Sequence, residues 1–266
     1  MIYTCYEMIR DCRADKPGGW SYFLAQYVPV VRGVLRHYFP DRAGEGALLE
    51  GVLKAVRQPG SSLFESLDPA PERVFVSELR QRVVEILRPP EKGEANIPID
   101  LDVLSTALES LTLTEKVVVW FETMRYAAGD TGRMIRMSAE TADKIRGRAA
   151  ELIRGSVDAW SRTVLADSGL ELGCEASARK SNECLPPRTF FDLIDGRTTW
   201  RTREEVERHV RTCWYCIDHY CRLLEAVDFL RASKPLEEGE VEPFRRLLGV
   251  QIPKRGFWRG LAGSSR

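Results

Sequence analysis

One group of cysteine and histidine residues in this sequence has the spacing of a metal site. Cys213 and Cys216 stand three residues apart, and His209 stands four residues before Cys213. Thiolate sulfur and imidazole nitrogen are ligands that zinc prefers, and four of them complete a tetrahedral structural site. With Cys184 as the fourth ligand, the sequence predicts a Cys₃His zinc site at Cys184, His209, Cys213 and Cys216. The alternative is that the cysteines are ordinary buried residues, which pack as small hydrophobic side chains.

These ligands need an element that turns them toward one ion. The segment from Arg203 to Leu224 has the composition of a helix, and residues four apart lie on the same helical face. We therefore expect His209 and Cys213 to project from one face of a single helix. A closed set of four ligands leaves no open coordination position, and the sequence contains neither a Ser/His/Asp order nor a phosphate-binding loop. The sequence thus predicts a protein that is not an enzyme.

The composition is that of a globular protein with two or three small domains. The 266 residues are 44% hydrophobic and 29% charged, and 39 basic residues balance 39 acidic ones. With a net charge of zero, any contact with nucleic acid must come from a local patch. No apolar run approaches the length of a membrane span, and the N-terminus lacks the apolar core of a secretory signal, so we expect a cytoplasmic protein without membrane contact. Seven cysteines then fit reduced thiols and a metal better than disulfides.

Helical periodicity dominates the chain and strand patterns are scarce, which predicts an all-α fold. Apolar residues spaced three and four apart predict four helices in a first domain over residues 1–90. These helices are 3–13, 20–39, 46–56 and 71–87. After a proline-rich linker, we expect a second domain over residues 101–165, with a helix from Thr114 to Tyr126 that Thr114 caps. Residues 167–182 have the composition of a linker, residues 184–232 form the zinc module, and residues 233–266 form a tail.

Residues 129–149 have the pattern of a helix-turn-helix. Gly132 is the small residue that lets the two helices touch, and Ser138 is placed to cap the second helix. The segment 131–154 holds six basic and three acidic residues, a local charge of +3. Because phosphate contacts carry most of the affinity for a duplex, this patch predicts DNA binding. The predicted DNA-binding residues are Thr141, Lys144, Arg146 and Arg148. The alternative is a helix-turn-helix that only docks another protein.

The segment from Cys184 to Leu224 resembles the zinc-binding anti-sigma domain of bacteria. The shared pattern is a leading cysteine, the helix end at Phe190–Gly196, an acidic helix, and His-x₃-Cys-x₂-Cys from His209 to Cys216. The resemblance implies a small helical module whose helices are held together by zinc. In that family the module sequesters a sigma factor.

Two earlier segments are similar to sigma factors of the extracytoplasmic-function type. Residues 20–35 match the start of their N-terminal domain (region 2), although Glu50 stands where a glutamine–glutamate pair is expected. Residues 111–154 are similar to their C-terminal DNA-binding domain (region 4), with Ala142 and Asp143 where valine and lysine are usual. The resemblance implies a regulator that binds core RNA polymerase and promoter DNA and is restrained in cis by the zinc module. The alternative is an adaptor or anti-sigma-type protein that uses a degenerate sigma fold to bind another sigma factor or signalling protein.

Overall fold

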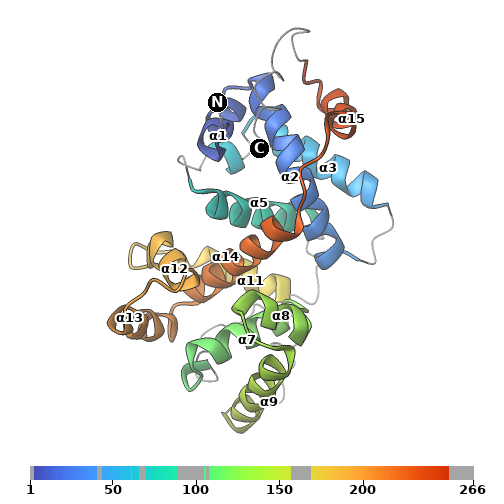
Figure 1. The fold of residues 1–266 in the computed structure, drawn as a ribbon. Coiled ribbons are helices and arrows are strands. Elements are labelled where there is room, and N and C mark those ends of the chain that lie inside the picture. Colours follow the sequence, from blue (N-terminus) through green and yellow to red (C-terminus); the bar gives the residue numbers. More distant parts are fainter. Residues whose placement is uncertain are drawn as a thin grey trace, which may run out of the picture. The chain divides into compact units, whose positions relative to one another are not determined.

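The computed structural model describes residues 3–40, 44–60, 62–65, 70–88, 105, 108–156 and 169–251. The regular secondary structure of these residues is entirely helical, which confirms the predicted all-α fold (Figure 1). The chain forms two compact units, Met1–Arg88 with Phe229–Arg266, and Pro89–Asp228. The division between them falls inside helix α14 (Trp214–Ala232). None of the helices in the described ranges has the length and apolar composition needed to cross a membrane.

The first unit is a helical bundle built around its longest helix, α2. Its helices are α1 (Cys5–Arg13), α2 (Pro17–Tyr38), α3 (Glu45–Arg57), α4 (Ser62–Glu65), α5 (Glu72–Leu87) and α15 (Glu238–Leu248). The buried rings of Phe23, Phe64 and Phe75 fill its centre, with ring centroids 5.7 to 6.3 Å apart. Four of these helices coincide, apart from a few residues at their ends, with those predicted from apolar spacing.

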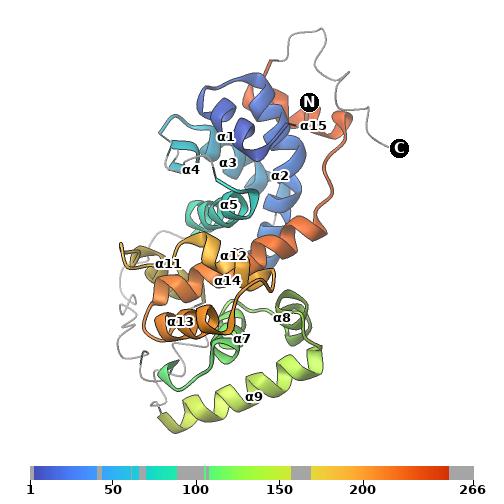
Figure 2. The ribbon, with the colours of Figure 1, turned by 60° about the vertical axis from the view of Figure 1, so that its left-hand side comes forward.

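The C-terminal helix α15 belongs to this bundle, although the sequence predicted a tail over residues 233–266. It lies beside α2 and α3, which are far from it in the chain (Figures 1 and 2). Val241 is fully buried, and the Arg32 guanidinium lies 5.6 Å from the centre of the Phe244 ring. The acidic residues that suggested a tail occupy the exposed face of an amphipathic helix. The part of the predicted tail from residue 252 onward lies outside the described residues.

A proline inside α2 creates the attachment point for the segment that leads into α15. Pro29 has no N–H group, so the carbonyl of Ala25 has no donor four residues later in its own helix. The Leu236 N–H group donates to this carbonyl over 2.8 Å. One turn further along α2, Gly33 makes room for the Phe229 ring, because a Cβ atom at Gly33 would lie 3.1 Å from ring carbon Cδ1. The segment that leads into α15 is therefore held by the free carbonyl that Pro29 creates and by the space that Gly33 leaves on α2.

We expect Leu236→Pro to destabilise the first unit, because it removes the N–H group that satisfies the Ala25 carbonyl. An unsatisfied buried carbonyl costs about 1–3 kcal/mol of unfolding free energy, measurable by denaturant titration. Adding Pro29→Ala to the same chain supplies a new donor inside α2 and should recover most of the loss. Leu236→Ala, which keeps the N–H group, is the control. A Leu236→Pro chain as stable as Leu236→Ala would contradict this account.

The second unit contains both the helix-turn-helix pattern and the cysteine cluster. Its helices are α7 (Leu113–Thr123), α8 (Ala128–Ile135), α9 (Ala139–Ser156), α11 (Gly169–Ala178), α12 (Pro187–Ile194), α13 (Trp200–Val210) and the first part of α14. Helix α11 occupies a stretch that we expected to be a linker. The small residues that suggested a linker allow close packing, because a Cβ atom at Gly173 would lie 3.5 Å from Asp218 Oδ1 and 3.8 Å from Met124 Cε.

Helices α8 and α9 form a helix-turn-helix at the predicted place (Figure 2). A Cβ atom at Gly132 would lie only 2.8 Å from the Met137 carbonyl oxygen, so no larger residue fits without a shift of the backbone. Arg136 ends α8 with a φ of 60°. The Ser138 hydroxyl oxygen accepts from the Thr141 N–H group over 3.1 Å, as expected for the cap of α9.

Candidate metal centre

Three of the four predicted ligands form a tight cluster of sulfur atoms. The Sγ atoms of Cys184, Cys213 and Cys216 lie within 4.8 Å of one another. Cys184 Sγ and Cys213 Sγ are 3.8 Å apart, and tetrahedral zinc with Zn–S bonds of about 2.3 Å requires a separation of about 3.8 Å. His209 Nε2 lies 3.1 Å from Cys216 Sγ. The three thiols are thus placed to bind a metal ion, and the imidazole lies beside them.

The ligands come from the end of α13, the turn after it, the start of α14 and the loop before α12, whereas we expected one helix to carry both His209 and Cys213. Helix α13 ends at Val210 and α14 begins at Trp214, so the predicted continuous helix from Arg203 to Leu224 is wrong. In a continuous helix, His209 and Cys216 would be separated by about 10 Å along the axis. The turn between α13 and α14, in which the Cys213 N–H group donates to the His209 carbonyl over 3.1 Å, removes this separation.

Backbone N–H groups surround the sulfur atoms. The Ser181 N–H group donates to Cys184 Sγ and the Leu185 N–H group donates to Cys216 Sγ, each over 3.3 Å. The hydrogen bond from the Cys216 thiol lowers the pKa of Cys213 to about 5, whereas the pKa of Cys216, which keeps the shared proton, is raised. The cluster therefore offers a thiolate at neutral pH, which suits a borderline-soft ion such as Zn²⁺. An ion held here would cross-link the loop before α12, the end of α13 and the start of α14.

Lys116 of α7 supports the turn that carries the ligands. Its side chain is buried, and its ammonium group donates to the carbonyl oxygens of Val210 and Arg211 over 3.2 and 2.9 Å. The carbonyls at the end of a helix have no partner within that helix, so Lys116 caps α13 from another element. No local sequence pattern marks Lys116, because its role depends on carbonyls about ninety residues later in the chain.

The stability of the second unit should depend on the charge of Lys116. Burial, followed by repulsion from Arg211, lowers the pKa of Lys116 from 10.5 to about 8. Between these values the unfolded chain binds a proton that the folded chain has released, so the unfolding free energy rises with pH in this window. We expect the difference in unfolding free energy between the parent chain and Lys116→Met to rise from pH 8 to pH 10.5. The difference for exposed Lys144→Met should stay flat, and a flat curve for both variants would refute the expectation.

A buried carboxylate on α14 joins three elements of the unit. Asp218 is fully buried and accepts hydrogen bonds from Trp120 Nε1 of α7 over 3.2 Å and from Ser177 Oγ of α11 over 3.0 Å. It also accepts from Arg222 Nε of its own helix over 2.7 Å. The Trp120 and Trp214 rings pack nearby, with centroids 5.7 Å apart. Helix α14 is therefore fastened to the helices that precede the cysteine cluster in the chain.

The comparisons with known proteins point to the anti-sigma factors. The anti-sigma factor RshA of Mycolicibacterium smegmatis is 33% identical to this chain over 70 residues, which are 68% of the length of that protein. This chain belongs to the anti-sigma factor family. The match covers 26% of the chain, and no family model and no solved structure matches it. The resemblance to sigma factors at residues 20–35 and 111–154 stays a prediction.

In this member of the anti-sigma family, the predicted DNA-binding residues lie on α9, and the basic ones among them face acidic side chains. The pairs are Lys144 with Glu140 at 2.7 Å, Arg146 with Asp143, and Arg148 with Glu115 at 3.1 Å. Glu115 also forms a capping box with Thr112, which caps α7 in place of the expected Thr114. Helix α9 has four basic and three acidic residues, a net charge of +1. Contact between these residues and DNA stays a prediction.

Proposed function

We propose that this protein is an anti-sigma-type regulator that binds another protein, a sigma factor or a regulator of similar build. The observation that carries the proposal is the membership of the anti-sigma factor family. The cysteine cluster supports it, since a metal bound there would add folding free energy by holding the end of α13 and the start of α14 to the loop before α12. In this proposal zinc is the ion, Cys184, Cys213 and Cys216 supply three ligands, and His209 Nε2 supplies the fourth.

The charges on α8 and α9 argue against promoter DNA as the main partner. Affinity for a duplex grows with the number of phosphates that a protein neutralises. Arg133 on α8 is already held by Asp130 at 2.8 Å and by both carboxylate oxygens of Asp228 at 2.8 and 2.9 Å. A phosphate approaching α9 would meet the acids that pair with its basic residues. The patch of +3 counted in the sequence is therefore largely neutralised within the chain.

If the partner is a protein and not DNA, the double variant Lys144→Ala, Arg148→Ala should have the same affinity for a DNA duplex as the parent chain. Fluorescence anisotropy with a labelled duplex, at salt concentrations from low to physiological, measures affinity and its salt dependence. The control is Arg201→Ala with Arg203→Ala, which likewise removes two exposed basic side chains that pair with acids, here Glu205 and Glu207. If α9 reads DNA, its double variant alone should weaken binding and reduce the salt dependence by one or two phosphate contacts.

The partner itself can be identified by affinity capture with the full chain. We expect a sigma factor to be retained from a bacterial lysate without core RNA polymerase, because an inhibitor that sequesters a sigma factor keeps it from the polymerase. Calorimetry with the purified sigma factor should then give a defined stoichiometry. Retention of core polymerase by the chain, in the absence of another sigma factor, would contradict the proposal.

A self-restrained sigma factor is the second candidate, and the contacts between α14 and α8 favour it. A segment that binds in cis acts at high effective concentration, so even weak contacts stay occupied. Asp228→Arg places two basic groups together at the Arg133 contact and should loosen it, and adding Arg133→Asp should restore it. In the second candidate, Asp228→Arg raises affinity for polymerase or promoter DNA. In the anti-sigma proposal it brings no such gain.

A further inference from the structure

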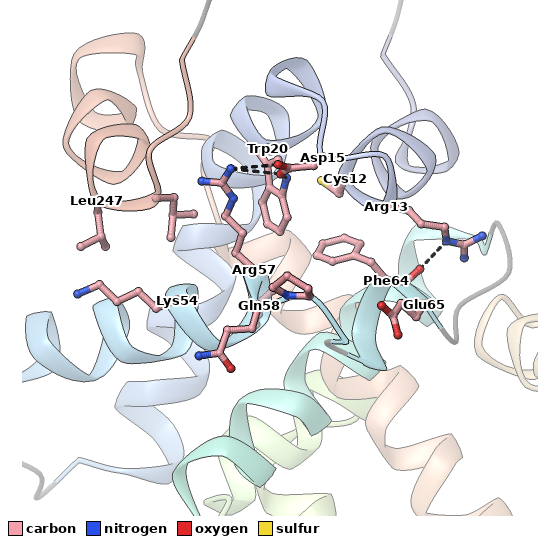
Figure 3. Close-up of a pocket in the computed structure, with 13 residues that line it drawn as sticks. Cys12, Arg13, Asp15, Trp20, Lys54, Arg57, Gln58, Phe64, Glu65 and Leu247 are labelled. Atoms are coloured by element: carbon pink, nitrogen blue, oxygen red, sulfur yellow. Dashed lines mark hydrogen bonds and ion pairs between the residues drawn. The ribbon is translucent and has the colours of Figure 1, made fainter.

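A cavity of about 600 Å³ opens within the first unit, among α1, α2, α3, α4 and α15 (Figure 3). Cavities that bind small ligands have volumes of about 300–1,000 Å³ and combine apolar walls with a few polar groups. Neither the cysteine cluster nor the helix-turn-helix contributes to this one. The cavity is therefore separate from the candidate metal centre and from the helix-turn-helix.

Buried apolar side chains form the walls of the cavity. The rings of Trp20 and Phe64 meet edge to face, with centroids 5.2 Å apart. Leu247 and Leu248 of α15 and Val56 of α3 also line the cavity. Trp20, Phe64 and Leu248 are each less than 10% exposed, so the walls belong to the packed core of the bundle. An aromatic or branched aliphatic group fits such walls.

Two basic side chains at the end of α3 bring unused hydrogen-bond donors to the cavity. Lys54 and Arg57 are three residues apart and so share one face of the helix. Arg57 lies 5.6 Å from the centre of the Trp20 ring, and its Nη2 group donates to Asp15 at 3.2 Å. Its Nε and Nη1 groups make no hydrogen bond to the described residues. The Lys54 ammonium is 3.8 Å from Glu50, beyond hydrogen-bond distance.

The acidic side chains of the cavity are already engaged. The Asp15 carboxylate accepts hydrogen bonds from Trp20 Nε1 over 2.8 Å and from Arg57 Nη2 over 3.2 Å. Figure 3 shows the contact between Asp15 and Arg57. Glu65 accepts from the Gly60 N–H group over 3.0 Å. The lining contains three basic side chains, Arg13, Lys54 and Arg57, and two acidic ones, Asp15 and Glu65, so positive charge is in excess. This imbalance favours an anion over a cation.

We propose that this cavity binds a small amphipathic anion: an organic carboxylate, sulfonate or phosphate with an aromatic or branched aliphatic body. The anionic group pairs with Arg57 and Lys54, and the apolar body packs against Trp20, Phe64 and Leu248. Because the leucine wall belongs to α15, a bound ligand contacts both the C-terminal helix and the bundle. Ligand binding then stabilises the attachment of α15 by mass action.

The probe for this site is 8-anilinonaphthalene-1-sulfonate, which combines an aromatic body with one sulfonate. We expect saturable fluorescence with one probe per full-length chain, and a dissociation constant raised at least about tenfold by Arg57→Gln. Lys54→Gln should also raise the dissociation constant of the probe. This variant breaks no hydrogen bond within the protein, so its effect reports the lost charge alone. The control is Arg36→Gln, which removes an exposed arginine of the same unit that also pairs with an acid, Glu45 at 3.2 Å.

An uncharged probe with the same rings, N-phenyl-1-naphthylamine, separates charge recognition from apolar binding. Its affinity should be the same for the parent chain and Arg57→Gln, which also shows that the variant keeps its fold. Equal sulfonate affinity in the parent, Arg57→Gln and Lys54→Gln chains would overturn the proposal. So would equal losses in Arg36→Gln and Arg57→Gln, or the lack of a saturable site in the parent chain.

Discussion

Replacing Cys213 with serine is expected to release the metal and to unfold the turn between α13 and α14. Cys213 stands in that turn, and its sulfur lies 3.8 Å from Cys184 Sγ. Structural zinc contributes about 10–16 kcal/mol of apparent binding free energy in small zinc modules, so losing one thiolate is costly. Elemental analysis should find one zinc per parent chain and none in Cys213→Ser, and circular dichroism should show lost helicity.

The matched control for this experiment is Cys221→Ser. Cys221 is also a buried cysteine of α14, but it lies outside the sulfur cluster. Its replacement should leave the zinc content at one per chain. A parent chain that is purified without metal and is fully helical would refute the zinc site, and so would a Cys213→Ser chain that retains its zinc.

Asp218→Ala should cause the largest loss of stability among substitutions outside the cluster. Removing one partner of a buried ion pair costs about 3–5 kcal/mol, because the remaining charge stays in a poorly solvated place. Here the carboxylate is fully buried beside Arg222, which is 2% exposed. The substitution also removes the acceptor for Trp120 Nε1 and Ser177 Oγ. We expect the denaturation midpoint to fall, and the Trp120 indole N–H group to lose protection from hydrogen exchange.

Two further variants test whether the effect belongs to the buried charge. Asp218→Asn keeps the shape and one acceptor oxygen but removes the charge, so its loss should be intermediate. Asp143→Ala removes an exposed carboxylate that pairs with Arg146, and pairs of this kind contribute about 0.2–1 kcal/mol. A loss for Asp218→Ala no greater than that for Asp143→Ala would show that the Asp218 network does not stabilise the unit.

Local patterns in the sequence determined the all-helical character of the chain, most helices of the first unit and the cysteines that gather at the cluster. Apolar spacing placed α2, α3 and α5, because one buried stripe per helix is visible within a short window. Gly132 and Ser138 marked the turn between α8 and α9 for a similar reason, since close approach and capping act over a few residues. The spacing of Cys213 and Cys216, together with the resemblance to the anti-sigma domain, predicted which cysteines gather in a candidate metal site, although not the geometry that builds it.

Tertiary structure decided the features that depend on residues far apart in the chain. The turn that brings His209 to Cys216 is supported by Lys116, whose partners are carbonyls and leave no mark in the side-chain pattern. In the linear sequence α11 has the composition of a linker, and only the fold shows its small residues packed against α7 and α14. In the same way α15 has the composition of an acidic tail, and only the fold shows its apolar stripe packed against α2. The linear sequence likewise shows an excess of basic residues around α9, but not that acidic side chains pair with them. Electrostatic and packing energies depend on distances in space, so only the folded chain shows which charges are paired and which apolar faces are covered.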